Sequence, residues 1–534
     1  MNAAQCSLWA REIGERAAMA ARLARDLPRF LRAPLTRDEV RDRVRRRLAT
    51  REQRFLAIVD RAVYGSARSP YRRLLANAGC ESGDLRALVA RKGLEGALRH
   101  LVGLGVYVSF DEFKGRREAI RGSARFTFSD RDFDTPLDPP HLFSFTGGSG
   151  GPPSRVTRSL GSIAEGASIF GVALEAHGVR QPRTVFWVGG SVVWQLIHLK
   201  LGHTVDAWYV PTPSLPVLAE AAHRYVSGLT ALGGRHLPLP AYCDLQAPEV
   251  IARWLVERAR PDAPIVVNGR SSSAVRVAQA AQAMGRRLDG VTFHCRSEPF
   301  SAARRRLIEA SGAQALPDYA SVELAYMAYG CPGAIVSDDV HLSVDRYAVV
   351  ERERAVGEAG PTVKALLFST LSETTPKIAF NVELGDSARV EERDCGCLLG
   401  DLGLRTHLSE IRSFEKLSTE GTSFARTNVV QILEEVLPAR FGGTALDYQL
   451  VEEEATDGAS MLVLRVAPSV GPLDEGAVRA TLLEELGRGS IVNEYQAGQL
   501  ERAESVVVKR LQPLATGAGK VLPFHLARAS MAGR

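Results

Sequence analysis

The feature that most constrains the fold is an alternation of short apolar segments with longer helical segments between residues 184 and 294. The short segments are rich in Val, Ile, Phe and Trp, which is typical of strands, and the segments between them follow a helical period. Such alternation favours parallel or mixed sheets that are covered by helices. The predicted strands are 184–188, 205–210, 264–267 and 290–294, and the predicted helices are 215–232, 250–258 and 274–284.

The sequence changes in character on both sides of this stretch. Helical spacing with Arg and Glu on the polar faces begins near Leu8 and continues to about Arg73, which predicts a helical N-terminal portion over residues 1–125. Strand-like and helical segments between 448 and 509 predict a small α+β unit, followed by a loop that holds Gly519 and Lys520. We therefore predict an α/β protein, in which a large domain of mixed sheets covered by helices (core 126–411) precedes a small, mobile α+β C-terminal domain (412–534).

Composition excludes several classes of protein. The 534 residues are 45% hydrophobic and 24% charged, as in ordinary globular proteins, and no apolar run reaches the roughly 18 residues of a membrane helix. Arg11 and Glu12 lie where a signal peptide needs an apolar core, and seven cysteines in so long a chain do not suggest a disulfide framework. The net charge is only +6, from 67 basic and 61 acidic residues. These features predict a cytoplasmic protein that binds neither nucleic acid nor membranes.

A glycine-rich segment is the first candidate binding element. Its residues Thr146, Gly147, Gly148, Ser149 and Gly150 set hydroxyls among glycines. Glycines let successive backbone N–H groups converge on an anion, because no Cβ blocks the approach. The segment lacks the Gly-Lys-Ser/Thr end of a Walker loop, and a following proline pair forbids the helix of a dinucleotide-binding fingerprint. By itself, the segment fits a phosphate cradle or a flexible linker.

Further motifs follow the glycine-rich segment along the chain. They are Arg296-Ser297-Glu298-Pro299, Tyr319-Ala320-Ser321-Val322-Glu323, Leu384-Gly385-Asp386, Ile411-Arg412-Ser413-Phe414-Glu415 and Gly519-Lys520. Their order and content resemble those of the adenylate-forming (acyl-activating) enzyme superfamily, whose motifs are Ser/Thr-Gly-Thr-Thr-Gly-x-Pro, Gly-Gly-Glu-Pro, Tyr-Gly-x-Thr-Glu, Thr-Gly-Asp, Gly-Arg-x-Asp-Asp and Gly-Lys. The resemblance covers about residues 130–528, is closest to the phenylacetate–CoA ligase branch, and extends to the acyl-protein synthetases of bacterial luminescence systems.

The resemblance implies a ligase in which a carboxylate attacks the α-phosphate of ATP, giving acyl-AMP and pyrophosphate. The glycine-rich segment would hold the β- and γ-phosphates, Tyr319 would stack on adenine, and Asp318 would accept from the adenine amine. Glu323 would bind Mg²⁺, which prefers carboxylate and phosphate oxygens, and Asp386 would accept both ribose hydroxyls. Lys520 would bring a positive charge to the bridging oxygen. The further contacts implied are Arg412 with ribose or phosphate, and Ser297, Glu298 and Pro299 at the cofactor.

The acyl pocket and the acceptor are less constrained than the nucleotide site. Arg296 stands where the family has Gly, which favours a short or anionic acid. CoA is the acceptor that the resemblance implies; a carrier-protein thiol, an amine, or activation of a small inorganic acid such as nitrite are alternatives. Because Pro153, Val322 and Phe414 depart from the family motifs, a nucleotide-binding module without turnover also remains open. The candidate pocket residues are Trp187, Gly189, Trp194, Asn268, Gly269, His294 and Arg296.

Four residues are candidate metal ligands: Cys331, His341, Cys395 and Cys397. Some members of the phenylacetate–CoA ligase branch carry a similar Cys/His/Cys-x-Cys set that binds zinc. Three thiolates and one imidazole make a closed tetrahedral site, which is typical of structural zinc. The alternative is three free thiols and an ordinary histidine. His198, His203 and His407 are expected to be structural or surface histidines.

Overall fold

The computed structural model describes residues 3–145, 155–189, 192–355, 362–414, 418–419, 422–423, 429–454, 460–488, 491–502, 505–516 and 519–526. The glycine-rich segment, with Thr146, Gly147, Gly148, Ser149 and Gly150, lies outside the described residues. The two strands that flank it, β3 (Leu142–Phe145) and β4 (Arg155–Arg158), pair antiparallel.

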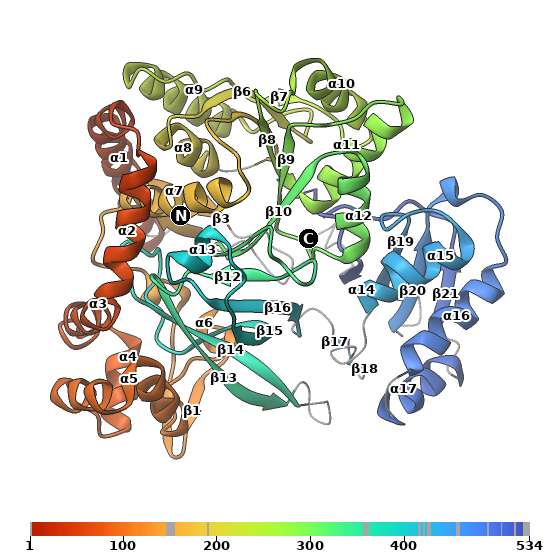
Figure 1. The fold of residues 1–534 in the computed structure, drawn as a ribbon. Helices are drawn as coiled ribbons and strands as arrows, with labels where there is room; N and C mark the ends of the chain where they lie inside the picture. The colour runs from red at the N-terminus through yellow and green to blue at the C-terminus, as the bar shows by residue number, and fades with distance from the viewer. Residues whose placement is uncertain are drawn as a thin grey trace.

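A 12-stranded mixed sheet forms the centre of the molecule (Figure 1). One half of this sheet is parallel and contains the four strands expected from the sequence. Three of them are buried almost throughout, as in a sheet covered on both faces, whereas the strand over 204–210 is only partly buried. Helices α9 (Val217–Leu232), α10 (Pro248–Arg258) and α11 (Ser271–Ala283) lie between these strands in the chain, as predicted. The parallel strands, in sheet order, are β7 (Ala241–Tyr242), β6 (Thr204–Val210), β5 (Arg183–Trp187), β8 (Ile265–Arg270), β9 (Val291–Arg296) and β10 (Gln314–Ser321).

The other half of the sheet is antiparallel and was not among the predicted strands. It continues from β10 through β11 (Ala325–Gly330), β12 (Val340–Leu342), β16 (Thr406–Ser413), β15 (Val382–Glu392), β14 (Thr362–Thr370) and β13 (Tyr347–Ala355). The core over this half joins the sheet to helices α3–α5, so the N-terminal portion is packed on the central sheet.

The N-terminal helices are α1 (Ala3–Arg32), α2 (Arg37–Ala49), α3 (Arg51–Ile58), α4 (Pro70–Asn77), α5 (Ser82–Gly103) and α6 (Phe110–Phe113), followed by the hairpin of β1 (Ala119–Arg121) and β2 (Ala124–Phe126). Thr36 caps the N-terminus of helix α2, where its hydroxyl and Glu39 form a capping box. A buried ion-pair cluster fastens these helices to the sheet: Glu165, on α7 (Leu160–Ala176), lies within 4 Å of guanidinium nitrogens of Arg47, Arg54 and Arg346.

The C-terminal residues form a separate four-stranded sheet with its own apolar core (Figure 1, blue). Its strand order is β21 (Val506–Lys509), β20 (Ser460–Val466), β19 (Tyr448–Glu454) and β22 (Phe524–Leu526). The strands β19, β20 and β21 and the helix α16 (Glu475–Gly487) match the expected α+β unit. The short helices α14 (Val429–Gln431) and α15 (Leu437–Phe441), helix α17 (Ile491–Arg502), and the hairpin β17 (Ser418–Thr419) and β18 (Thr422–Ser423) complete this region.

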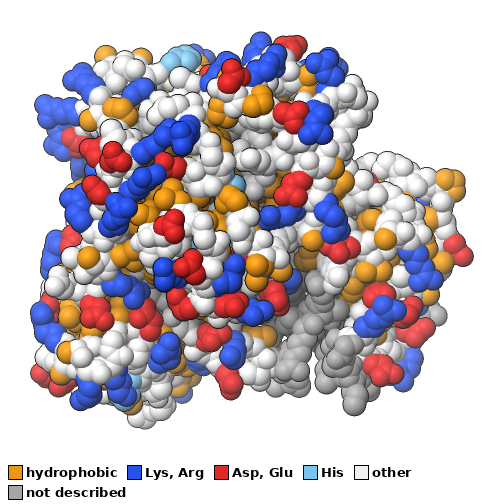
Figure 2. Space-filling view, viewed as in Figure 1, with side chains coloured by type: hydrophobic (Ala, Val, Ile, Leu, Met, Phe, Trp, Pro, Cys, Tyr) orange, Lys and Arg blue, Asp and Glu red, His pale blue; other side chains and the backbone are white. Residues whose placement is uncertain are grey.

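Remaining helices cover the central sheet or join its strands: α8 (Val193–Lys200), α12 (Ala302–Ala310) and α13 (Leu398–Asp401). Basic and acidic side chains are interspersed over the face shown in Figure 2. Within the part of the chain that the structure describes, no helix combines the length and the apolar character needed to cross a bilayer.

Candidate active site

The predicted pocket residues lie at the carboxyl ends of neighbouring parallel strands. Backbone pairing aligns Trp187 of β5 with Gly269 of β8, and Gly269 with Cys295 of β9. One residue earlier, Asn268 is aligned with His294. Ligands of open α/β sheets bind at this edge of the strands. The same edge also receives Gly189 after β5, Trp194 on α8, Arg296 at the end of β9, and Asp318 and Tyr319 on β10.

Arg296 and Trp194 form one wall of this site. The guanidinium carbon of Arg296 lies 4.2 Å from the centroid of the Trp194 ring, and the Trp194 ring packs edge-on against His294 at 4.7 Å. Nη1 of Arg296 is buried and has no hydrogen-bond partner among the described residues. Burial lowers the pKa of Arg296, although Asp318 opposes this effect. A buried N–H group without a partner favours an anionic or carbonyl-bearing ligand beside it.

Asp318 and Asn268 hold His294 between them. Nε2 of His294 lies 3.1 Å from Oδ2 of Asp318, and Nδ1 lies 2.9 Å from Oδ1 of Asn268. All three groups face the interior, and the His294 and Asn268 side chains are 1% and 0% exposed. Asp318 therefore has an intramolecular partner in addition to any adenine amine.

Tyr319 and Asp386 meet although three strands separate β10 from β15 in the sheet order. The Tyr319 hydroxyl donates to Oδ2 of Asp386 at 2.9 Å, which requires the sheet to curve back on itself. Burial and the Asp386 charge together raise the pKa of Tyr319 well above its ordinary value. The predicted adenine-stacking and ribose-binding residues are thus brought into direct contact.

Glu323 and Arg412 each have a charged partner. Glu323 is 7% exposed and forms an ion pair with Lys114, which follows the N-terminal helix α6. Arg412 is on β16 beside β15, where it pairs with Ser387, the neighbour of Asp386, and its Nη1 lies 3.3 Å from Asp338. The N-terminal portion therefore contributes a cation to the surroundings of the candidate magnesium ligand.

The loop that carries Lys520 is fastened to the carboxyl edge of the parallel strands. The backbone N–H of Val521 donates to Oε1 of Glu298 at 3.0 Å, and Lys520 itself is braced by Thr516 through two hydrogen bonds. A Cβ on Gly519, whose φ is +77°, would lie 3.2 Å from Nη1 of Arg270. Glycine is suited to this position because the φ is left-handed and the approach is close. The structure thus places the Lys520 loop beside the ends of β8 and β9.

Glu298 is fully engaged by protein groups. It accepts from the backbone N–H and hydroxyl of Ser272 and from Nη1 of Arg304, at 2.8–2.9 Å, besides Val521. Arg304 also binds Glu434 of the C-terminal region, with the three charged side chains 0–1% exposed. Beside it, Ser297 has a left-handed φ of +66°, so this turn is strained. Through these contacts, Glu298 links the parallel half of the central sheet to the C-terminal region.

Two further guanidinium groups near this edge carry buried N–H groups that have no partner among the described residues. Arg270, at the end of β8, has Nε and Nη1 in this state, and Arg158, which follows the glycine-rich segment on β4, has Nε and Nη1. Arg158 is held by a hydrogen bond from Nη2 to the Val322 carbonyl at 2.6 Å. Together with Arg296, these groups gather cationic N–H donors that no described residue accepts from, which suits phosphate or carboxylate.

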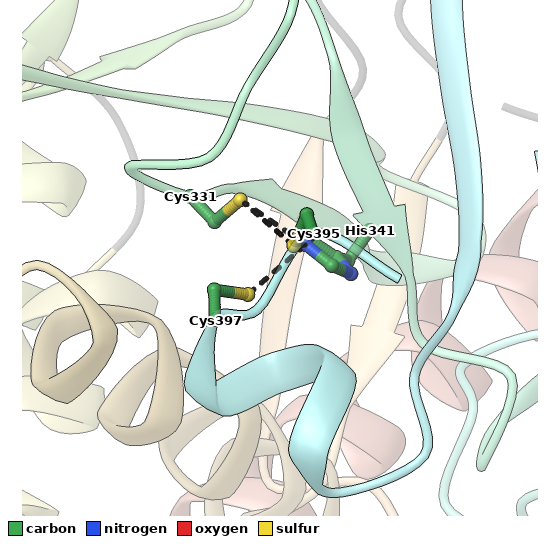
Figure 3. A group of neighbouring side chains, drawn as sticks. All are labelled: Cys331, His341, Cys395 and Cys397. Carbon is green, nitrogen blue, oxygen red and sulfur yellow. Dashed lines mark hydrogen bonds between the residues drawn. The ribbon is translucent and has the colours of Figure 1, made fainter. Parts of the chain in front are cut away.

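The four candidate metal ligands converge at a single point (Figure 3). Their ligand atoms all lie within 4.8 Å of one another, and Sγ of Cys331 is 3.8 Å from Sγ of Cys395. Two sulfurs bound to one tetrahedral zinc are separated by about the same distance, 3.8 Å, because each Zn–S bond is about 2.3 Å. The residues come from the ends of β11 and β12 and from the turn before α13.

The orientation of His341 also suits a metal. Nδ1 of His341 donates to the Leu404 carbonyl at 2.6 Å, which leaves the Nε2 lone pair facing the three sulfurs at 3.2–3.4 Å. A hydrogen bond from Cys331 lowers the pKa of Cys397, whereas the pKa values of Cys331 and Cys395 are raised, mainly by hydrogen bonding to Cys397 and by burial. The histidine is thus fixed in the tautomer that ligates a metal.

Several site residues could not be identified from the sequence. Lys114, Arg158, Arg270 and Arg304 have no motif around them, and Lys114 lies 209 residues from its partner Glu323. Arg270 carried one signal, because it lies three residues after the predicted strand 264–267, at the edge where ligands bind. His198, which was expected to be structural, is 0% exposed and bonds to Asn268.

Comparison with known proteins supports the fold. No protein-family model matches the sequence, and no curated protein matches it either. Among solved structures, 2-hydroxyisobutyryl-CoA ligase in the postadenylation state with 2-HIB-AMP matches with a TM-score of 0.55 and 13% identity, over 93% of this chain and 91% of that chain. The same ligase with R3-HIB-AMP matches with a TM-score of 0.51 and 13% identity, over 92% and 89%. The matched ligase carries an acyl adenylate in both structures, so the chain described here has the fold of the adenylate-forming enzymes.

Proposed function

We propose that the protein is an ATP-dependent adenylate-forming ligase, which activates a carboxylic acid as acyl-AMP and transfers it to an acceptor, with CoA as the first candidate. The observation that carries this proposal is the position of the Lys520 loop. A segment from the C-terminal sheet lies against Arg270 and Glu298 at the edge where the acyl and nucleotide candidates converge. A C-terminal segment without a role at the site would not be expected to pack this closely against the edge.

The cationic donors at the edge give the site its affinity for anions. Arg158, Arg270 and Arg296 hold buried N–H groups that lack partners among the described residues, and such groups cost free energy unless a ligand accepts from them. ATP and a carboxylate substrate would supply the acceptors. We propose that Lys520 stabilises the charge that develops as pyrophosphate leaves, while Tyr319 and Asp386 position the nucleoside.

The donor set near Glu323 fits a hydrated Mg²⁺ bound mainly through phosphate oxygens. Mg²⁺ usually takes only one or two protein carboxylates and fills its other positions with phosphate and water. Glu323 would be the carboxylate, and the ion would supply electrostatic stabilisation of the transferred charge. Lys114, released from Glu323, would then be free to contact the nucleotide phosphates.

We propose that residues 412–534 act as the small domain that closes over the site, with residues 126–411 as the core and 1–125 as a helical addition. The C-terminal region has its own sheet and core, so it can move as a unit. The ion pairs of Arg304 with Glu298 and Glu434 would stabilise the arrangement of the two regions seen in this structure.

The proposed acid is short or anionic, because Arg296 narrows the pocket and brings a positive charge to it. Pyrophosphate release across a panel of short, dicarboxylic, aromatic and long-chain acids tests this proposal, and nitrite belongs in the panel as a small inorganic acid. A clear preference for long acyl chains would contradict it.

We propose zinc at the cluster of Cys331, His341, Cys395 and Cys397, in a structural role because all four positions are taken by protein atoms. The ion would join the segment after β11 to the turn before α13. Metal analysis of the purified protein is expected to give close to one equivalent of zinc.

Formation of acyl-AMP, measured by ATP–pyrophosphate exchange and mass spectrometry, tests the first half-reaction. Adding CoA, a carrier protein or amines to the same mixture then identifies the acceptor. Release of AMP with a new CoA thioester is the expected result. Binding of ATP without exchange under any of these conditions would instead identify a nucleotide-binding module that has lost turnover.

A further inference from the structure

A buried line of hydrogen-bonded side chains crosses the parallel sheet from the candidate active site. It runs from Asp318 to His294, then to Asn268, His198 and His203, with successive links of 3.1, 2.9, 3.0 and 3.0 Å. The exposed fractions of the last four residues are only 1%, 0%, 0% and 7%. Each residue comes from a different element or turn, so nothing in the chain's local sequence enforces this line.

Aromatic rings enclose the line. The Phe170 ring packs against His294 at 4.7 Å and against His198 at 5.1 Å, and Phe186 packs edge-on against His198 at 5.5 Å. Buried polar groups in such surroundings depend on one another for hydrogen bonds. If a donor becomes an acceptor at one end of the line, each later hydrogen bond therefore has to reverse its direction.

The line has two complete hydrogen-bond patterns. In the first, neutral His294 donates from Nε2 to the Asp318 carboxylate, the Asn268 amide donates to His294, His198 donates from Nε2 to Asn268, and His203 donates from Nδ1 to His198. In the second, the Asp318–His294 pair takes one more proton from solvent, Nδ1 of His294 donates to the Asn268 carbonyl, and every later bond reverses. The same heavy atoms serve both, because turning the Asn268 amide exchanges its oxygen and nitrogen.

The two patterns differ at the far end of the line. In the first pattern, His203 presents a bare Nε2, and in the second pattern it presents an Nε2–H donor. Burial lowers the pKa of His294 and Arg296 adds to this effect, whereas the hydrogen bond and charge of Asp318 favour an additional proton on the pair. The nitrogen of His203 that carries the hydrogen therefore depends on the charge of the Asp318–His294 pair. Conversely, a ligand that fixes this hydrogen changes the charge that the pair favours.

His203 lines a cavity of about 510 Å³ at the amino edge of the parallel strands, opposite the candidate active site. Three arginines also line this cavity, Arg183, Arg235 and Arg258, against one carboxylate, Asp206. Asp206 is paired with Arg183 at 2.5 Å, and Arg258 is paired with Glu257 at 2.7 Å. The excess positive charge of the lining is therefore that of Arg235. A cavity of this volume accommodates a small metabolite.

We propose that this cavity binds an anionic small molecule, and that its occupancy is coupled through the His203–His198–Asn268–His294 line to Asp318 at the candidate active site. An anion beside His203 favours the Nε2–H donor and hence the second pattern. That pattern places a further proton at the opposite edge, which strengthens attraction for an anionic substrate there. The consequence for catalysis rests on the proposed ligase function; the binding and the hydrogen positions do not.

Histidine side-chain NMR tests the proposal without an activity assay. Protein labelled with ¹⁵N-histidine is titrated with inorganic phosphate, with sodium chloride at matched ionic strength as the reference. Spectra that distinguish bare from hydrogen-bearing imidazole nitrogens are recorded, and the signals are assigned with His203→Asn and His198→Phe. We expect phosphate to convert Nε2 of His203 and Nδ1 of His294 to N–H together.

Variants separate the cavity from the candidate nucleotide site, which also attracts phosphate. Arg235→Gln is expected to weaken the phosphate response of both histidines about tenfold or more, whereas Arg253→Gln, an exposed arginine of α10 outside the cavity, leaves it unchanged. His198→Phe is expected to keep the His203 response and to abolish that of His294. If His198→Phe does not fold, His203→Asn serves instead, with the His294 response lost.

Three results would overturn the proposal. Phosphate could leave the His203 signal unchanged, it could change His203 without His294 in the wild type, or His294 could respond equally in Arg235→Gln. The last result would assign the response to phosphate at the opposite edge. Because none of these measurements uses turnover, failure of the ligase proposal would leave their interpretation intact.

Discussion

Arg304 is the residue whose replacement is expected to test most sharply how the two regions are held together. Its guanidinium lies 2.9 Å from Glu298 of the large region and 2.8 Å from Glu434 of the C-terminal region, and all three side chains are essentially buried. Arg304→Met keeps most of the side-chain volume and removes the positive charge. Two buried carboxylates then lose the guanidinium that lies between them.

The expected cost is about 3–5 kcal/mol of unfolding free energy, the range for removing one member of a buried ion pair. Ser272, Ser301 and the Val521 N–H still donate to the two carboxylates, which places the effect at the lower end. Adding Glu298→Gln and Glu434→Gln removes both stranded charges. The triple variant is therefore expected to be more stable than Arg304→Met alone, although it carries more substitutions.

Urea unfolding at several pH values measures these differences. Burial already raises the pKa of Glu434 in the presence of Arg304, and loss of Arg304 raises it further. A group whose pKa is raised on folding stabilises the folded state below its unfolded pKa, and this contribution is lost as pH rises through the folded pKa. The deficit of Arg304→Met is thus expected to be larger at pH 8 than at pH 5. A triple variant less stable than the single one, or a deficit independent of pH, would refute the reasoning.

Glu165→Gln is expected to lower the unfolding free energy by about 3 kcal/mol at pH 7, because Arg346 and Arg47 outweigh burial and lower the pKa of Glu165 to about 2. In urea unfolding, the difference from wild type should disappear as the pH falls from 4.5 towards 2. A difference that does not change with pH would contradict this prediction. Cys397→Ser is expected to reduce bound zinc below half an equivalent and to lower the melting temperature, whereas Cys80→Ser, at a cysteine outside the cluster, keeps the metal. Tyr319→Phe removes the donor to Asp386 and is expected to weaken ATP binding about tenfold by calorimetry; unchanged affinity would show that the contact does not position the nucleotide.

The parallel half of the sheet could be predicted from the sequence, and the antiparallel half could not. Strands such as β8 are buried along almost their whole length, so their apolar runs are continuous. In β13 the first four residues are buried and the next five alternate between exposed and half-buried, so no single period describes the strand. Its partner β14 reverses this order, with its exposed residues first. Strands that are partly covered by the core give a mixed pattern that resembles a loop.

The candidate site shows the same division. The motifs and the predicted strand ends indicated residues that the fold does bring to one edge, such as His294, Arg296 and Asp318. The resemblance also indicated a Cys/His set that converges in space. It did not identify Lys114 or Arg304, because these residues act through partners that are distant in sequence. Long-range ion pairs leave no periodic or local signal, so only the folded structure reveals them.

The central claim is that Lys520 acts on a triphosphate held at the carboxyl edge of the parallel strands. ATP–pyrophosphate exchange by Lys520→Ala, with Lys509→Ala from strand β21 as the matched control, tests this claim most directly. The account predicts that Lys520→Ala loses exchange by a factor on the order of a hundred or more while still binding ATP, and that Lys509→Ala retains exchange. Equal exchange by wild type and Lys520→Ala, or a wild-type protein that does not bind ATP, would contradict it.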